Sequence, residues 1–181
     1  MMRPLTGKRV AILASHGFEQ SELLEPMKAL RDQGAEVDVV SPEEGPIQGF
    51  AHFDKGETVA VDRRLEGVDA GSYDALVIPG GLFNPDALRR DDDALRFTRA
   101  FFDAGKPVGA ICHGPWVLVD AGVIDARELT SVPNIQRDLQ NAGARWVDRE
   151  VVVDRGLVTS RTPKDLDAFC ATLVEQIRDA A

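Results

Sequence analysis

The chain has 181 residues, of which 44% are hydrophobic, and carries a formal net charge of −9. This length and apolar content suit one globular domain over residues 1–181, while the acidic balance without a Lys/Arg cluster argues against a nucleic-acid or anionic-membrane partner. No apolar run approaches the roughly 18 residues that span a bilayer and no signal-peptide core is seen, so a cytoplasmic location is expected.

The first third of the chain predicts a β–α–β unit followed by edge hairpins. Residues 9–14 form an apolar run without alternation, which is typical of a strand covered on both faces. Residues 21–33 predict a helix with one apolar stripe that ends at Gly34, and residues 37–40 predict a second strand. Glycine and proline then interrupt residues 41–62, which predicts one or two small hairpins at the sheet edge.

The rest of the chain alternates predicted strands and helices. Strands are predicted at residues 75–78, 108–111, 146–147, 151–153 and 157–160. Helices are predicted at residues 92–104, 116–121 and 134–141, and from Pro163 onward. This alternation implies an α/β fold with a mostly parallel sheet and antiparallel additions. Ligands bind such sheets beyond the carboxyl ends of the strands, so the loops after residues 14, 78 and 111 are expected to form the site.

Cys112 lies where a buried strand gives way to a helix, because it follows residues 108–111 and precedes Gly114 and Pro115. The first N–H groups of a helix favour a nearby anion, so this position is expected to bias the thiol towards thiolate. A similar strand–turn–helix elbow carries serine nucleophiles in other enzymes. A small buried core residue is the alternative interpretation, and it is the one that we predict for Cys170.

Histidines and acids near this elbow are the candidate partners of the thiol. His113 is tied to Cys112 by sequence, His16 is the reserve because its loop opens on the same edge, and His52 is predicted to be a solvated loop residue. Glu19 ends the first loop and is predicted to lie against the sulfur, where it would take a proton or, if burial raises its pKa, donate a hydrogen bond to the thiolate. The alternative for Glu19, and equally for Asp86, is a carboxylate at a helix N-terminus, stabilised by the dipole.

Backbone groups complete the predicted site, and other site classes find no support. Gly81 follows a parallel strand, where a glycine lets the backbone approach a ligand and aim an N–H at it. The sequence has no Walker-type run, no paired-cysteine zinc spacing and no His-Glu-x-x-His helix. The three acids at residues 91–93 are interpreted as a helix cap. We therefore expect no cofactor and no metal.

Four segments of the chain form a combination of motifs: Gly17-Phe18-Glu19 before a helix, YDALVIPGG at residues 73–81, GKPVGAICHGP at residues 105–115 and EVVVD at residues 150–154. Together they resemble the PfpI family of intracellular cysteine peptidases and protein deglycases, within the class I glutamine-amidotransferase-like superfamily. The resemblance implies a flavodoxin-like three-layer α/β/α sandwich with added hairpin strands. It also implies a homodimer or hexamer, with Cys112 as nucleophile and Glu19 hydrogen-bonded to it.

The resemblance further implies a peptidase-like triad. In that branch the histidine after the cysteine pairs with an acid from a neighbouring subunit; His113 matches the histidine, and Asp86 is the candidate acid. The family's peptidases carry a glutamate in this loop, and residues 82–86 look one residue longer here. No histidine follows His113, which argues against the glutamine hydrolysis of true amidotransferases.

Three functions remain open at this stage. The first is a stress-related cysteine hydrolase acting on peptides, in which Cys112 attacks an amide, His113 moves the proton and the N–H groups of Gly81 and His113 hold the oxyanion. The second is a glyoxalase or deglycase acting on a small carbonyl compound, a 2-oxoaldehyde or a glycated amine, with Glu19 moving protons. The third is an oxidation-sensing stress protein or holdase, in which Glu19 stabilises an oxidised Cys112.

Overall fold

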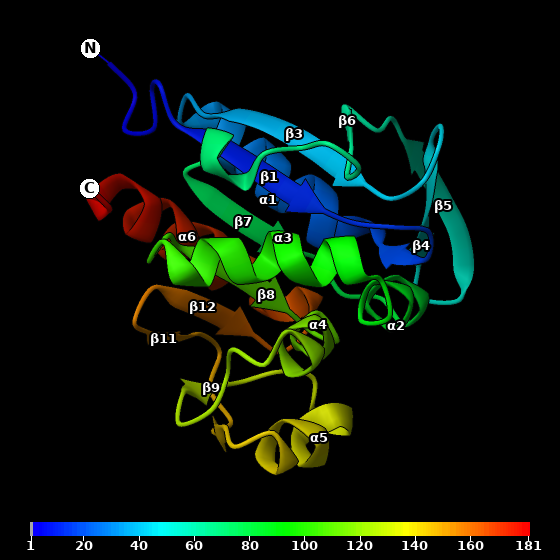
Figure 1. Cartoon of the computed structure of the whole chain (residues 1–181), viewed down its shortest axis with the longest axis vertical. Coiled ribbons are helices and arrows are strands. Elements are labelled where there is room, and N and C mark those ends of the chain that lie inside the picture. The colour runs from blue at the N-terminus through cyan, green and yellow to red at the C-terminus, as the bar shows by residue number, and fades with distance from the viewer. Residues whose placement is uncertain (1) are drawn as a thin grey trace.

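The computed structural model describes residues 2–181 and is built on a seven-stranded sheet with the order β11-β12-β8-β7-β1-β3-β6 (Figure 1). The strands are β1 (Arg9–Leu13), β3 (Glu36–Ser41), β6 (Arg63–Arg64), β7 (Ala75–Ile78), β8 (Val108–Ile111), β11 (Val152–Asp154) and β12 (Leu157–Ser160). All neighbouring pairs are parallel except β11 and β12. The predicted mostly parallel sheet with an antiparallel addition is confirmed.

Helices cover both faces of this sheet (Figure 1). One layer holds α1 (Gln20–Asp32) and α6 (Leu166–Asp179), and the other holds α3 (Asp92–Asp103) and α4 (Pro115–Ala121). Successive residues of β1 point to opposite faces, so Val10 and Ile12 pack with the first layer while Ala11 and Leu13 pack with the second. Because both faces are covered, the strand is apolar from Val10 to Leu13, as its sequence indicated.

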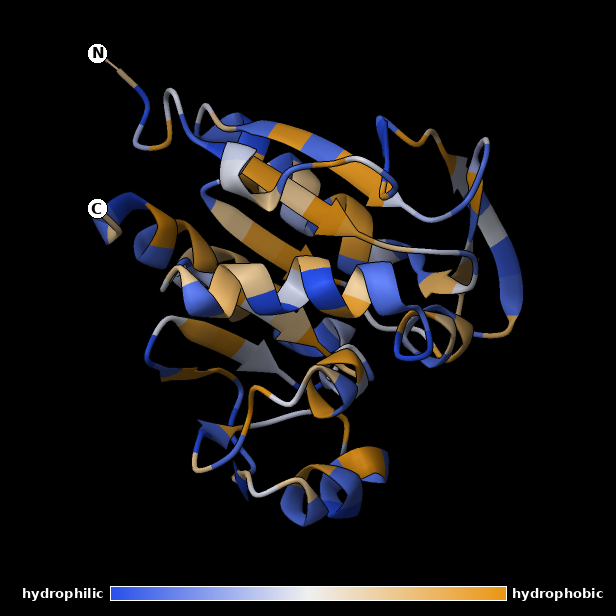
Figure 2. Cartoon of the chain, in the orientation of Figure 1, coloured by the Kyte–Doolittle hydropathy of each residue, from blue (hydrophilic) through white to orange (hydrophobic). Residues whose placement is uncertain are grey.

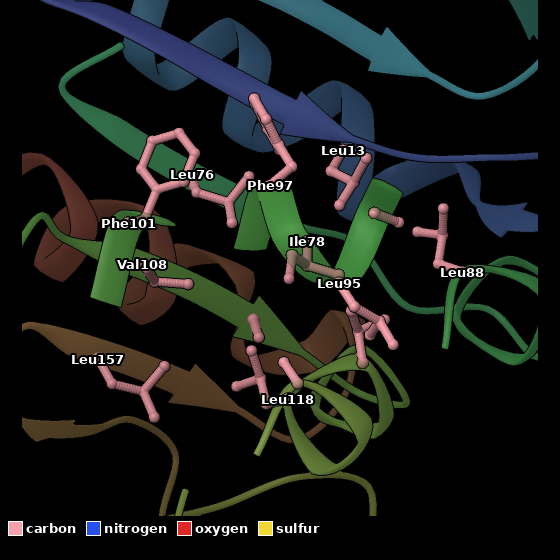
Figure 3. Packing of buried hydrophobic residues seen from close by; sticks show 14 of the residues in the cluster. Leu13, Leu76, Ile78, Leu88, Leu95, Phe97, Phe101, Val108, Leu118 and Leu157 are labelled. Atoms are coloured by element: carbon pink, nitrogen blue, oxygen red, sulfur yellow. The ribbon is translucent and has the colours of Figure 1, made fainter. Parts of the chain in front are cut away.

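The core beneath α3 shows how the layers are joined (Figure 3). Phe97 and Phe101 project from α3 towards the sheet, and their rings meet edge to face with centroids 5.1 Å apart. Leu76 and Val108 from neighbouring strands belong to the same buried cluster. Hydrophobic residues concentrate in the strands, and the helices alternate hydrophobic and hydrophilic residues (Figure 2).

Smaller elements extend the sandwich at its edges. A separate sheet orders β2 (Phe18–Glu19), β4 (Ile47–Ala51) and β5 (Asp54–Val59), another pairs β9 (Glu128–Leu129) with β10 (Arg145–Trp146), and the short helices are α2 (Phe83–Leu88) and α5 (Gln136–Asn141). The antiparallel β4–β5 hairpin confirms the predicted edge hairpin. Helix α2 replaces part of a predicted loop, and β2, β6 and β9 are each too short to produce a periodic signal.

The acidic residues at 91–93 lie at the start of α3. Asp91 accepts a hydrogen bond from the backbone N–H of Ala94 at 2.9 Å, which confirms that the acids at residues 91–93 cap α3.

Within residues 2–181, every helix lacks the combination of length and apolar content that crossing a membrane requires.

Phe101→Ala is expected to destabilise the fold by about 3–5 kcal/mol, because a fully buried ring would be replaced by a cavity. Urea unfolding followed by circular dichroism measures the loss. Phe53→Ala is the matched control, since Phe53 is 99% exposed and its removal should leave the unfolding midpoint unchanged. Equal midpoints for the two variants would contradict the placement of α3 on the sheet.

Candidate active site

Cys112 occupies a strained elbow directly after β8. Its φ is +62°, in the left-handed region that residues with a Cβ rarely adopt. The backbone is held on both sides, because Cys112 N donates to the Ser160 carbonyl at 3.1 Å and Cys112 O accepts from Val132 N at 3.0 Å. These bonds fix the sulfur at the carboxyl edge of the parallel strands, where the sequence predicted it.

The absence of a side chain at Gly80 lets the turn after β7 lie close to both Cys112 and Glu22. A Cβ on Gly80 would lie 2.7 Å from the Cys112 Cβ and 2.5 Å from Glu22 Oε1, both shorter than real contacts allow. On the far side of the elbow, a Cβ on Gly114 would lie 2.7 Å from the Ile78 carbonyl oxygen. The glycines of the two motifs are thus required by close packing around the nucleophile.

Glu22, and not Glu19, is the carboxyl that contacts the Cys112 thiol, so the prediction for Glu19 is corrected. Glu22 lies in the first turn of α1, is fully buried and accepts a hydrogen bond from Gly80 N at 3.0 Å. Glu19 ends β2 and its carboxylate accepts from the backbone N–H of His52, at 3.2 Å for Oε2. Both acids line the same pocket, but the turn of α1 directs only Glu22 inward.

Burial raises the pKa of Glu22 well above its ordinary value, and the nearby charge of Glu19 raises it further. The Gly80 and Gly81 N–H groups act in the opposite direction without cancelling the effect. Glu22 Oε2 is buried and has no hydrogen-bond partner of ordinary geometry within residues 2–181. A proton on this carboxyl is therefore available to the sulfur beside it.

Burial also raises the pKa of the Cys112 thiol, and the charge of Glu22 adds to the rise. The N–H groups of His113 and Gly81 point to the sulfur and lower the pKa by less. The backbone donors at the elbow thus act in the direction expected from its position, but desolvation of the thiol outweighs them. A protonated Glu22 removes the repulsion and can donate to the thiolate, so the pair is best suited to sharing one proton.

His113 reaches the sulfur despite being the next residue. Its Nδ1 lies 3.4 Å from Cys112 Sγ, and its ring lies 5.2 Å from that of Trp116. Burial lowers the pKa of His113, which favours the neutral imidazole. In the part of the chain that the structure describes, no carboxylate hydrogen-bonds this ring.

Asp86 and His16 lie apart from this group. Asp86 is exposed in the first turn of α2 and does not line the pocket, so within one chain it does not complete a triad with His113. His16 Nδ1 accepts a hydrogen bond from Gln48 N at 3.1 Å, which occupies that nitrogen outside the pocket. The reserve role predicted for His16 is therefore not supported.

The sulfur opens into a pocket of about 430 Å³. Its walls are formed by Glu19, Glu22, His52, Gly81, Leu82, Cys112, His113, Thr162, Pro163 and Lys164. His52 is exposed at its φ of +57° in the β4–β5 turn, and its place on the pocket wall was not predicted. Thr162 and Lys164 were also missed, because Pro163 marks the start of the last helix in the sequence but does not indicate that this turn reaches Cys112.

Comparison with known proteins identifies the family. The DJ-1/PfpI family model matches residues 8–176. The chain is 45% identical over 162 residues to "Putative cysteine protease YraA" of Bacillus subtilis, covering 90% of this chain and 94% of the relative. It is 46% identical over 168 residues to General stress protein 18 of B. subtilis, with the same coverage, and 46% identical over 165 residues to Protein/nucleic acid deglycase 2 of Escherichia coli, covering 90% and 93%.

A solved structure agrees with the fold. A two-domain protein from Anabaena variabilis with DJ-1/ThiJ/PfpI-like and ferritin-like domains superposes with a TM-score of 0.89 at 34% identity, covering 94% of this chain and 48% of that protein. The α/β sandwich and its cysteine elbow thus define a DJ-1/PfpI-type protein. The chain belongs to the DJ-1/PfpI family, as the sequence motifs indicated.

The raised pKa of Glu22 predicts a pH-dependent effect of Glu22→Gln. The unfolded chain releases this proton near the ordinary pKa of 4.5, whereas the fold retains it to higher pH. Wild-type stability from this group is therefore present below that pKa and is lost as the pH rises, at up to about 1.4 kcal/mol per pH unit. Glu22→Gln removes the loss, so the variant should gain stability relative to wild type as the pH rises above the ordinary pKa of 4.5.

Urea unfolding at a series of pH values measures this difference. Glu25→Gln is the matched control, since Glu25 is exposed on the same helix and its variant should differ from wild type by an amount that does not change with pH. A Glu22→Gln offset that is constant with pH would show that the carboxyl is ionised in the fold.

Proposed function

We propose that the protein is a thiol-dependent glyoxalase or deglycase that converts 2-oxoaldehydes, or their early adducts with amines, into 2-hydroxy acids. The observation that carries this proposal is the fully buried Glu22 carboxyl against the Cys112 thiol, in a small pocket. The 46% sequence identity to a relative that is named a deglycase supports this proposal. A family relative named as a general stress protein is consistent with a stress-related role.

The shared proton of the pair accounts for each step. The Cys112 thiolate adds to the aldehyde carbon, and the alkoxide takes the proton of Glu22, which gives a hemithioacetal and a carboxylate. That carboxylate removes the proton from the former aldehyde carbon and returns a proton to the neighbouring carbon, while the hydroxyl proton passes to the neighbouring oxygen, which gives a thioester. Water then hydrolyses the thioester, and the acid is released with the thiol regenerated. Such proton transfer accelerates reactions by about 10²- to 10⁴-fold.

The backbone favours the charged species that form along this path. The N–H groups of Gly81 and His113 point to the sulfur and are placed near any oxygen on the carbon bonded to it. Donors of this kind contribute about 3–4 kcal/mol each in other enzymes. Since both belong to rigid turns, they need little reorganisation during the reaction.

Turnover of methylglyoxal tests the proposal. Wild type should form a 2-hydroxy acid, Cys112→Ser should form none, and Glu22→Gln should lose about 10²- to 10⁴-fold in kcat because the mobile proton is gone. Glu25→Gln should retain wild-type activity, since its side chain is outside the pocket. Enzymatic assay of lactate by stereoisomer measures the product, and a Glu22→Gln variant as active as wild type would refute the assigned role of Glu22.

Peptide hydrolysis is the second candidate, favoured by the 3.4 Å contact between His113 Nδ1 and Cys112 Sγ. A neutral His113 could take the thiol proton and pass it to the leaving amine. The relative named as a cysteine protease agrees with this chemistry. The geometry within one chain favours it less, since His113 has no acid partner among residues 2–181. A homodimer or hexamer in which Asp86 approaches from a neighbouring subunit would supply one.

Cleavage of a fluorogenic peptide distinguishes the two candidates. If peptide hydrolysis is the main activity, His113→Ala and Asp86→Asn should each lower kcat/KM at least about tenfold, while Glu22→Gln affects it less. If the glyoxalase proposal is correct, peptide cleavage should be absent or equal in wild type and Cys112→Ala. Light scattering on the same samples reports whether the active species is oligomeric.

A further inference from the structure

Two polar side chains of the pocket wall have no role in the chemistry proposed above. Thr162 and Lys164 come from the turn at Pro163–Asp165 that leads into α6, and both line the pocket that holds Cys112. Within residues 2–181, neither the Thr162 hydroxyl nor the Lys164 ammonium takes part in a hydrogen bond, and Lys164 forms no ion pair. Both donors are free to interact with a ligand.

The carboxylate of Glu19, which lines the same pocket as Lys164, already has a hydrogen-bond donor. Glu19 accepts from the backbone N–H of His52 with both carboxylate oxygens, at 3.4 and 3.2 Å. Burial raises the pKa of Glu22 and lowers the pKa of His113, so it favours the neutral form of both groups. Lys164 is therefore the cation in this pocket wall without a partner in the described chain.

The turn that carries the two donors is held rigidly. Asp165 is 4% exposed and accepts three hydrogen bonds from Arg161, one from its backbone N–H at 3.0 Å and two from its guanidinium at 2.8 and 3.0 Å. Arg161 also pairs with Asp148 at 2.8 Å. The same segment begins at Ser160, whose carbonyl accepts the N–H of Cys112. The backbone that carries the two donors thus stands at a fixed place relative to Cys112.

We propose that Thr162 and Lys164 form a carboxylate-binding subsite beside Cys112, so that the preferred substrates are carbonyl compounds bearing a carboxylate. This inference rests on the proposed function for the identity of the reacting group. A hydroxyl and an ammonium from one rigid turn can hold both oxygens of a carboxylate while the carbonyl reaches the sulfur. The pocket volume of about 430 Å³ leaves room for such a small, two-ended molecule.

Alkylation of Cys112 tests the subsite without any turnover. The thiolate displaces iodide from iodoacetate or iodoacetamide, two reagents of similar size that differ in having a carboxylate or a neutral amide. Because the same thiolate reacts with both, a change in its pKa cancels in the ratio of the two rates. Peptide mass spectrometry separates the Cys112 product from that of Cys170.

Lys164→Met should lower the iodoacetate-to-iodoacetamide ratio about 3- to 5-fold, the size expected for one partly exposed charge pair. Lys164→Arg should retain the wild-type ratio, and so should Lys28→Met, since Lys28 is exposed outside the pocket. High salt should reduce the difference between wild type and Lys164→Met. An unchanged ratio in Lys164→Met, or an equal fall in Lys28→Met, would overturn the proposal.

Turnover of two aldehydes separates this inference from the function on which it rests. The probes are methylglyoxal and 4,5-dioxopentanoate, which is methylglyoxal with a carboxymethyl group on its methyl carbon. Wild type should prefer the carboxylated compound in kcat/KM, and Lys164→Met should lose this preference by the same factor as in alkylation. Turnover of both compounds with no change in preference would refute the subsite alone. Turnover of neither would refute the proposed function and leave the alkylation ratio to decide the subsite.

Discussion

The burial of one carboxyl beside one thiol is the constraint on which the rest of the site depends. Glu22 is fully buried against Cys112; burial raises the pKa of both groups, and the charge of Glu22 raises that of Cys112 further. Two neighbouring acids in a low-dielectric site cannot both ionise cheaply, so one proton is shared and the sulfur becomes nucleophilic only as part of the pair. This arrangement requires backbone donors close to both groups, and the Gly80-Gly81 turn provides them.

The fold makes that approach possible by bringing three chain segments to one edge of the sheet. β7 and β8 are adjacent and parallel, so the glycine turn after β7 lies beside the cysteine elbow after β8. Helix α1 reaches the same point from the layer that it forms with α6. The strain at Cys112, with its φ of +62°, is compensated by backbone bonds to Ser160 and Val132. The bond to Ser160 ties Cys112 to β12, the strand that precedes the Thr162–Lys164 turn.

The sequence allowed the sheet, its helices and the position of the cysteine elbow to be predicted, because long apolar runs and the glycine and proline after Cys112 are local signals. The prediction of Glu19 missed Glu22, because the side chain that faces the sulfur depends on how α1 is rotated. A signal was present: Glu22 precedes Leu23 and lies four residues before Pro26, and all three are buried on one face of α1. A carboxyl on the apolar stripe of an amphipathic helix indicates a buried acid, whereas Glu19 lies before the helix begins.

The pocket walls were beyond prediction for a different reason. His52 and Lys164 are 112 residues apart in the chain. Both line the Cys112 pocket because the turn of the β4–β5 hairpin and the turn that leads into α6 lie at the same edge of the sheet. Neither residue lies in the motifs that define the nucleophile, so the chemistry and the selection of substrate have separate origins in the sequence. The thiol–carboxyl pair can serve peptide hydrolysis, aldehyde isomerisation or oxidation sensing. The surrounding loops therefore decide which carbonyl compound reaches the pair, and a charged side chain on a rigid turn is well placed to make that choice.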